Sequence, residues 1–247
     1  MMIDTSLNYS GKTVAIIGGS SGIGNATAQA FRSCGAEVHV TGTRASEGDY
    51  DPAEGSDLEG LSYHQVDAAD NAAIAAFRQK FDRMDVLICS QGMVMYKRAE
   101  FEPENFAKVL QVNLNSLMTF AGAFHDLLME AKGSLIIISS TAAYHATVGN
   151  PAYNASKTGA MGLTRTLGKA WAPDGIRVNG IAPGLIATKM TKVTTDHPKR
   201  REATIRNIPV GRIGDPEDMA GLSLFLASPL ASYIVGQTII ADGGLLL

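Results

Sequence analysis

The chain has 247 residues, a length that fits one large α/β domain or two small ones. Its apolar content of 45% and charged content of 18% are typical of globular proteins, and its net charge of −3 gives no indication of a polyanionic partner such as nucleic acid. Two cysteines, Cys34 and Cys89, exclude a disulfide framework, and no apolar run reaches the roughly 18 residues of a membrane span. Because residues 1–12 have no signal-peptide pattern, we expect a cytoplasmic protein with no membrane partner.

Apolar runs of strand length recur along the chain, and most are unbroken rather than alternating with polar residues. Unbroken runs are expected of strands that are buried on both faces of a parallel sheet. The runs cover residues 13–19, 36–42, 61–67, 84–92, 133–140, 176–184 and 236–244.

Helical patterns fill most of the intervals between these runs, at residues 24–35, 71–81, 103–131, 151–171 and 216–228. This alternation predicts one α/β domain over residues 1–247, a Rossmann-type, doubly wound parallel sheet with helices on both faces. Two segments interrupt the pattern. Residues 44–60 contain Pro, Gly and many acids and are predicted to form a loop. Residues 187–208 are polar and basic without a clear period, and we expect a mobile substrate lid there.

A glycine-rich turn, "GGSSGIG", follows the first strand and precedes the first helix. Glycines allow a tight turn and let the backbone approach a pyrophosphate at the helix N-terminus. The spacing Gly-x-x-x-Gly-x-Gly differs from the usual dinucleotide fingerprint, so a purely structural turn remains an alternative for this motif taken alone. The residues predicted to bind the cofactor here are Gly18, Ser20, Ser21, Gly22, Ile23 and Gly24.

The end of the second strand, "VTGTR", bears on the choice of cofactor. Dinucleotide folds place an acid there to bind the ribose of NAD, or an arginine near the 2′-phosphate of NADP. This chain has Thr43 and Arg44 and no acid, which favours NADP(H) over NAD(H). A solvated Arg44 is the alternative, and Ser20 and Ser21 stand where a basic residue would strengthen the case.

Tyr153 and Lys157 are four residues apart in a predicted helix, so their side chains share one face. A free tyrosine titrates near pH 10, and a neighbouring ammonium is expected to lower the pKa of the phenol. The pair is therefore either a tuned acid–base or an ordinary surface pair. Tyr144 offers no such combination, because Val148 stands one turn further on.

These motifs, in this order, resemble those of the short-chain dehydrogenase/reductase family, and in particular its 3-oxoacyl reductase-like branch. The resemblance runs from about Gly11 to Gly244 and includes a similar C-terminal block, residues 211–244. The matching residues are Gly18, Gly22, Gly24, Asp67, Gly92, Asn113, Ser140, Tyr153, Lys157, Pro183, Gly184 and Thr188. The chain departs from the family at Ile17, which is usually Thr, and at residues 89–91, where Cys-Ser-Gln replaces Asn-Asn-Ala.

The resemblance implies hydride transfer between a nicotinamide and a carbonyl or secondary alcohol. It implies that Tyr153 is the general acid/base, that Lys157 tunes it and holds the nicotinamide ribose, and that Ser140 hydrogen-bonds the substrate oxygen. Asn113 is expected to brace a water that relays protons to Lys157. Further cofactor contacts are expected from Asp67, Gly92, Pro183, Gly184, Ile186 and Thr188. Relatives are usually oligomeric, so we expect a homotetramer or a homodimer.

The substrate is less well indicated. Met93 and Met95 follow the fourth strand and are candidate pocket lining, with core packing as the alternative. Tyr144 is predicted to be pocket wall, and His145 either faces the substrate or is a loop histidine. These apolar candidates favour a ring or acyl chain over a charged sugar. The histidines show no metal-ligand spacing, so we predict no catalytic metal.

Two other function classes are weighed against a reductase. A non-enzymatic dinucleotide-binding regulator would keep the glycine turn but would have no need of Tyr153 with Lys157. An epimerase or dehydratase that uses the nicotinamide transiently would be expected to have a longer substrate domain. The basic stretch "HPKRRE", residues 197–202, is either a solvated face of the lid or a phosphate site.

Overall fold

Seven parallel strands form one sheet in the computed structural model, which describes residues 7–247. The strand order is β3-β2-β1-β4-β5-β6-β7, and every neighbouring pair is parallel. The strands are β1 Thr13–Ile17, β2 Glu37–Gly42, β3 Ser62–Gln65, β4 Val86–Cys89, β5 Ser134–Ile138, β6 Arg177–Pro183 and β7 Thr238–Ala241. Each lies within one of the runs predicted from the sequence, so the predicted doubly wound sheet is confirmed.

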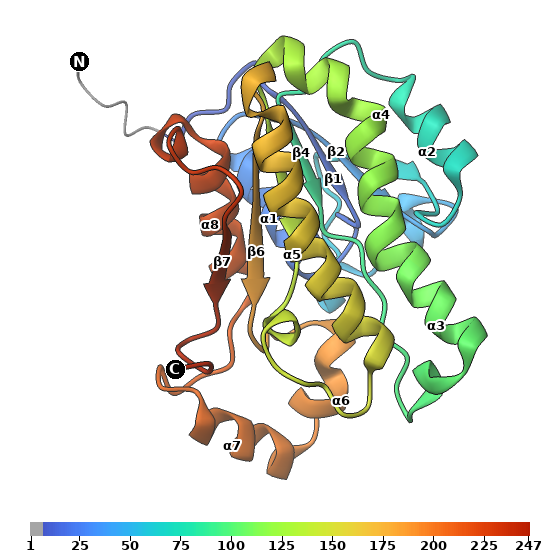
Figure 1. Cartoon of the computed structure of the whole chain (residues 1–247), viewed down its shortest axis with the longest axis vertical. Helices are drawn as coiled ribbons and strands as arrows, with labels where there is room; N and C mark the ends of the chain where they lie inside the picture. Colours follow the sequence, from blue (N-terminus) through green and yellow to red (C-terminus); the bar gives the residue numbers. More distant parts are fainter. Residues whose placement is uncertain (1–6) are drawn as a thin grey trace.

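Helices cover both faces of this sheet. They are α1 Gly22–Ser33, α2 Asn71–Arg78, α3 Pro103–Leu110, α4 Ser116–Ala131, α5 Pro151–Trp171, α6 Lys192–Thr195, α7 Pro198–Asn207 and α8 Pro216–Ala227. In Figure 1, α4 and α5 lie in front of the sheet, while α1 and α8 lie behind it. Buried residues of α2, α4 and α5 form one apolar cluster with the sheet, and those of α1 and α8 form the second.

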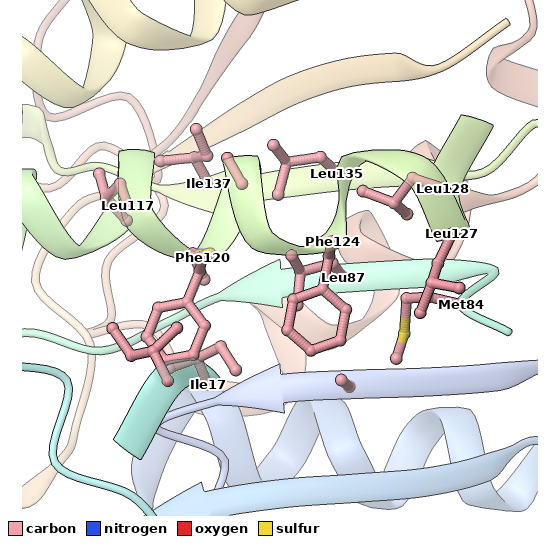
Figure 2. Packing of buried hydrophobic residues seen from close by; sticks show 14 of the residues in the cluster. Ile17, Met84, Leu87, Leu117, Phe120, Phe124, Leu127, Leu128, Leu135 and Ile137 are labelled. Carbon is pink, nitrogen blue, oxygen red and sulfur yellow. The ribbon is translucent and has the colours of Figure 1, made fainter. Parts of the chain in front are cut away.

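The front cluster is built on the aromatic residues of α4. Figure 2 shows Phe120 and Phe124 pointing from α4 toward the strands, near Ile17 and Leu87. Both phenylalanines are fully buried, and truncating either to alanine is expected to cost about 3–5 kcal/mol of stability. This packing holds the carboxyl ends of β1 and β4 in a fixed place.

The strand order reverses at β1, because β2 pairs with one side of it and β4 with the other. Open α/β sheets form their ligand crevice at such a switch point, at the carboxyl ends of the strands. The glycine turn follows β1 at this edge, and residues 90–92 follow β4 beside it. In Figure 1 the arrowheads of β6 and β7 point toward α6 and α7, so residues 187–208 lie at the same edge.

Two segments differ from the sequence prediction. The predicted helix over 103–131 is divided into α3 and α4 by one π-helical turn, Gln111–Asn115. The hydroxyl of Ser116 donates to the carbonyl of Val112 at 2.6 Å, a side-chain bond that competes with the regular ladder. Residues 187–208, for which no regular structure was predicted, contain α6 and α7, and Pro198 stands at the first position of α7.

The loop predicted at residues 44–60 holds only two short 3₁₀ turns, Glu47–Asp49 and Pro52–Glu54. The crossover from β2 to β3 is therefore made without an α-helix. Among residues 7–247, no helix combines the length and the apolar character needed to cross a membrane.

Candidate active site

A cavity of about 460 Å³ opens at the carboxyl edge of the sheet. The glycine turn, the ends of β4 and β5, the start of α5 and residues 188–191 surround it. The predicted site residues that line it are Gly18, Ser20, Ser21, Gly22, Ile23, Gly24, Thr43, Asp67, Gly92, Met93, Ser140, Tyr153, Lys157, Pro183, Gly184, Ile186 and Thr188.

Five predicted site residues do not line this cavity: Arg44, Met95, Asn113, Tyr144 and His145. Tyr144 is 41% exposed, and its hydroxyl donates to the carbonyl of Thr238 at 3.4 Å. The exposed ring of His145 lies against the carbonyl of Ala146. Tyr144, predicted to be pocket wall, and His145, for which a place facing the substrate and a place in a loop were both left open, therefore lie outside the lining of this cavity.

The glycine turn has the geometry of an anion cradle. Gly18 has a φ of +75°, which favours glycine, and a Cβ on Gly24 would overlap the carbonyl oxygen of Gly18. The N–H of Gly18 donates to the hydroxyl of Thr41 at 3.0 Å, which fixes the start of the turn. The first turn of α1 has no acidic residue and no side-chain cap. Its early N–H groups and the helix dipole are therefore suited to a phosphate group.

Lys157 is buried on the inner face of α5, with only 4% of its surface exposed. Its Nζ donates to the carbonyl of Ile138 at 2.8 Å and lies 5.7 Å from the centre of the Tyr153 ring. Burial lowers the pKa of this ammonium to about 8. The ammonium makes no hydrogen bond to the phenol, so the two groups share a face of α5 without direct contact.

The phenol of Tyr153 does not behave as the sequence predicted. Burial raises the pKa of Tyr153 above its ordinary value, a hydrogen bond with Ser140 opposes this shift, and Tyr96 and Glu100 add to it. The expectation was a pKa lowered by Lys157. Desolvation of the buried phenol outweighs the hydrogen bond with Ser140, so the phenol holds its proton more tightly than a free tyrosine does.

Ser140 lies two residues beyond the end of β5 and caps a short 3₁₀ turn, Thr141–Ala143. Its Oγ accepts a hydrogen bond from the N–H of Ala142 at 3.1 Å, which orients the hydroxyl toward Tyr153. The neighbouring Ser139 donates to the carbonyl of Lys157 at 2.8 Å and so joins β5 to α5. The Ser140 hydroxyl is therefore held by the backbone of its own turn, and β5 is joined to the helix that carries Tyr153.

Asn113 lies in the π-helical turn and is fully buried. Its Oδ1 accepts from the N–H of Met93 at 2.8 Å, and its Nδ2 donates to the carbonyl of Met93 at 2.9 Å and to the hydroxyl of Ser156 at 3.2 Å. The side chain thus connects the π turn, the segment after β4 and helix α5. It stands behind the cavity wall and holds Met93 in that wall.

Arg44 belongs to a cluster that the sequence did not reveal. Its guanidinium lies 4.7 Å from the centre of the Tyr50 ring and donates to the carbonyl of Asp49. The hydroxyl of Tyr63 donates to the carbonyl of Arg44 at 2.5 Å, and the N–H of Arg44 donates to the hydroxyl of Tyr50 at 3.2 Å. Tyr50 approaches Gly42 so closely that a Cβ there would overlap its hydroxyl. No sequence motif links these residues.

Residues 189–190 are bonded to two other segments. Lys189 pairs with Glu54 at 3.1 Å and donates to the hydroxyl of Ser56 at 3.2 Å, which joins this part of the chain to the 44–60 segment. The hydroxyl of Tyr96 donates to the carbonyl of Met190 at 2.8 Å. These bonds fix Lys189 and Met190, which both line the cavity.

The departures from the family pattern are accommodated by packing. Ile17 is buried in the front apolar cluster, and Cys89 is fully buried beside it. Burial raises the pKa of the Cys89 thiol to about 12, so this cysteine is not a reactive thiolate. The amide of Gln91 donates to the hydroxyl of Ser116 at 2.9 Å and ties the end of β4 to the π turn. Within the described residues, no group of three His, Cys, Asp or Glu side chains is placed to hold a metal ion.

Comparison with known proteins agrees with this geometry. The family model described as enoyl-(acyl carrier protein) reductase matches residues 17–246. The chain is 35% identical over 243 residues to the 2-dehydro-3-deoxy-D-gluconate 5-dehydrogenase of Bacillus subtilis (strain 168), covering 95% of this chain and 94% of that one. It is 35% identical over 245 residues to the 3-oxoacyl-[acyl-carrier-protein] reductase FabG of Chlamydia pneumoniae, covering 95% and 97% of the two chains.

A solved structure shares the same architecture. The gluconate 5-dehydrogenase from Burkholderia cenocepacia J2315, in complex with NADP and tartrate, is 25% identical and has a TM-score of 0.87, with 97% of each chain covered. The sheet, the glycine turn and these similarities define an oxidoreductase that binds a nicotinamide dinucleotide. The chain belongs to the short-chain dehydrogenase/reductase family and is an NAD(P)-dependent enzyme of that family.

Proposed function

We propose that this protein is a carbonyl reductase or alcohol dehydrogenase that prefers NADP(H), with Tyr153 as its general acid/base. The observation that carries the proposal is that Tyr153, Lys157 and Ser140 line the same cavity as the glycine turn. A group that exchanges a proton with the substrate oxygen therefore lies beside a cradle for the cofactor phosphates. Hydride transfer to a carbonyl requires both parts together.

The bound nicotinamide supplies the hydride in reduction and accepts it in oxidation. Ser140 donates a hydrogen bond to the substrate oxygen and polarises the carbonyl. Tyr153, protonated at neutral pH, donates its phenolic proton to the alkoxide that forms. Lys157 places a cation behind the phenol and stabilises the phenolate that remains. In oxidation, the phenolate takes the alcohol proton as the hydride leaves.

The other predicted contacts complete the cofactor site in this proposal. The glycine turn would hold the pyrophosphate, Asp67 the adenine, Lys157 the nicotinamide ribose and Thr188 the carboxamide. Pro183, Gly184 and Ile186, which line the same cavity, would contact the nicotinamide end of the cofactor. Arg44 binds the 2′-phosphate of NADP, and the NADP complex of the Burkholderia relative supports this preference.

For the substrate, we favour a ring or acyl ketone or the corresponding alcohol. The apolar side chains of Met93, Ile186 and Met190 line the cavity, and the acyl-carrier reductase FabG is a relative. Residues 187–208 serve as the substrate lid. The relatives that act on gluconates make a sugar acid the first competing substrate to test.

We further infer a homotetramer or homodimer in the cytoplasm. The outer face of α5 carries small residues, with Ala155 and Thr158 exposed and open space around Gly162, which suits close contact with a second helix. Cys34 and Cys89 are both free thiols, in keeping with a reducing compartment.

The direct test is oxidation of NADPH, followed by absorbance, with a 3-oxoacyl thioester, a cyclic ketone and a keto-sugar acid. Tyr153→Phe is expected to lower kcat about 10³-fold, because the proton donor is lost. Tyr144→Phe is the matched control, since this nearby tyrosine lies outside the cavity, and its kcat should stay within about twofold of the wild type. Tight NADPH binding without turnover of any compound would instead favour the regulator hypothesis.

A further inference from the structure

We propose that Glu100 is a positioning residue for Tyr153. Its carboxylate joins the first turn of α5 to the segment after β4 and places a negative charge near the phenol. The inference rests on the proposed role of Tyr153. Glu100 is not part of any motif considered above, and nothing in its local sequence distinguishes it from the exposed glutamates nearby.

Glu100 lies in the short 3₁₀ turn Ala99–Phe101, and none of its surface is exposed. Three N–H groups donate to its carboxylate. Met95 N donates to Oε1 at 2.9 Å, Asn150 Nδ2 to Oε1 at 3.4 Å, and Tyr153 N to Oε2 at 2.9 Å. Among residues 7–247, no ion pair includes Glu100. A buried carboxylate without a cation is costly unless its hydrogen bonds are well placed, so a specific use of this charge is indicated.

The carboxylate supplies the cap that α5 otherwise lacks. Pro151 at the first helical position has no N–H, and the side chain of Asn150 makes no cap bond. The N–H of Tyr153 is one of the early donors that no carbonyl of the helix can satisfy. Glu100 accepts this bond from outside the helix, and its negative charge is favourable at the positive end of the 21-residue helix dipole.

The same carboxylate fixes the cavity wall. Asn113 binds both backbone groups of Met93, and Glu100 binds the N–H of Met95, so the segment 93–95 is held at both ends. Asn150 adds a bond from its Nδ2 to the carbonyl of Met95 at 2.9 Å. Glu100 therefore determines where Tyr153 lies relative to the wall that faces the substrate. Small displacements of a reacting group lower the rate of reaction strongly.

The charge of Glu100 acts on the phenol as well. The groups that shift the pKa of Tyr153 are Ser140 after β5 and Tyr96 and Glu100 after β4, while the Lys157 ammonium lies 5.7 Å from the centre of its ring. Glu100 raises the pKa of Tyr153, in the same direction as burial, and Ser140 lowers it. Glu100 thus opposes Ser140 and helps to keep the phenol in the protonated form that donates to an alkoxide.

Glu100→Gln tests this inference, with Glu102→Gln as the matched control. Glu102 is exposed, two residues away, and its side chain makes no cap bond. The ionisation of Tyr153 is followed by phenolate absorbance, as the difference between each protein and the same protein carrying Tyr153→Phe. We expect Glu100→Gln to shift this titration to lower pH and to lower kcat about tenfold, with NADPH affinity within about twofold of the wild type. Glu102→Gln should change neither quantity.

An unmoved titration in a folded Glu100→Gln protein would overturn the inference, whether or not kcat falls. Asn150→Ala separates the two effects, because it removes a bond to Met95 and the longest of the three bonds to the carboxylate, while the charge of Glu100 and its bond to the N–H of Tyr153 remain. It should lower kcat and leave the titration at the wild-type pH. If Glu100→Gln does not fold, Glu100→Asp replaces it. The shorter side chain keeps the charge but cannot reach both N–H groups, so kcat should fall about tenfold with an unmoved titration. An unchanged kcat in Glu100→Asp would also overturn the inference.

The titration requires no substrate, so the two proposals fail differently. If no ketone or alcohol is turned over by the wild type, the proposed function fails, while the phenolate titration still reports on Glu100. If turnover is found and Glu100→Gln leaves the titration unmoved, only the inference about Glu100 fails.

Discussion

The proposed catalytic end of the cavity differs in construction from the Arg44 cluster outside its lining, which we propose binds the adenosine part of the cofactor and which is called the adenosine end below. At the catalytic end, Tyr153, Lys157 and Ser140 come from one long helix and from the end of a central strand. At the adenosine end, Arg44, Tyr50 and Tyr63 come from an irregular crossover and from an edge strand. The first group was predicted from the spacing of Tyr153 and Lys157 together with the family resemblance, and most of the second was not predicted. Residues on regular elements have a fixed spacing in space, whereas loop residues meet only through the tertiary fold.

The two ends also treat charge differently. Lys157 is buried and bonded to a backbone carbonyl, so its charge is costly to the fold. The guanidinium of Arg44 lies at the surface over an aromatic ring, where solvent screens it. We therefore expect substitutions at the catalytic end to lower activity while raising stability. Substitutions at the adenosine end should alter cofactor choice with little effect on stability.

Lys157→Met is expected to have the largest effect. It should lower kcat about a hundredfold or more, because the phenolate loses its cation. At pH 7 it should raise the free energy of unfolding by about 1–3 kcal/mol. Burial has lowered the pKa of Lys157 to about 8, so below that pH the folded wild type carries the cost of a buried ammonium charge, which Met does not have. The cost disappears as the pH rises from 8 toward the ordinary lysine value.

Urea denaturation of Lys157→Met and the wild type at pH 7 and at high alkaline pH measures this effect. The stability advantage of the variant should be present at pH 7 and should shrink as the pH rises. Lys169→Met is the control, because Lys169 is exposed on the same helix. A variant that is less stable than the wild type at pH 7 would contradict the view that the catalytic end carries the strain of a buried charge.

The difference between regular elements and tertiary contacts also explains which features could be predicted from the sequence. The helix predicted over 151–171 is observed as Pro151–Trp171, and all seven predicted strands are present, because their periodicity is local. The π turn around Asn113 was not predicted, since it depends on the bonds of Asn113 to Met93 and Ser156. The raised pKa of Tyr153 could not be inferred from a spacing that suggested the opposite direction. That shift depends on burial, which only the packed fold determines.

At the adenosine end, Arg44→Ala is expected to weaken NADPH binding about tenfold and to leave NADH binding within about twofold, because the proposed contact of the guanidinium is with the 2′-phosphate, which NADH lacks. Fluorescence titration with both cofactors measures this difference. Arg98→Ala is the matched control, since Arg98 also stacks on an aromatic ring, Phe101 at 4.4 Å, but follows β4 on the other side of the cavity. Equal losses for both cofactors in Arg44→Ala would mean that Arg44 supports the loop and does not select the phosphate.

Tyr50→Phe should have a smaller effect in the same assay, about threefold on NADPH. Burial alone would raise the pKa of Tyr50, but hydrogen bonds with Ser20, Tyr63 and the N–H of Arg44 outweigh it, so the pKa is lowered. The hydroxyl therefore orients the loop that carries Arg44. If Tyr50→Phe discriminated between the cofactors more strongly than Arg44→Ala, the hydroxyl itself would be the group that contacts the phosphate.

The smallest expected effect concerns the edge of the sheet next to this loop. His39 Nδ1 lies 3.1 Å from His64 Nε2, and both rings are partly buried, His64 against Phe77. Burial lowers the pKa of His39, and burial with His39 lowers that of His64 to about 4. Folding favours the neutral form of both rings, so their contribution to stability is complete above the ordinary histidine pKa. This contribution is lost as the pH falls toward 4, because the unfolded chain then binds protons that the folded chain does not.

His64→Gln should therefore lose about 1 kcal/mol less stability than the wild type between pH 7 and pH 5, a value discounted for the partial exposure of the ring. Urea denaturation at both pH values gives the difference, and His145→Gln, an exposed histidine, should match the wild-type slope. A larger loss of stability between pH 7 and pH 5 in His64→Gln than in the wild type would show that the pair is stabilised by protonation.

Because β3 contributes Tyr63 to the Arg44 cluster, loss of this edge at low pH should weaken NADPH binding before the catalytic end is affected.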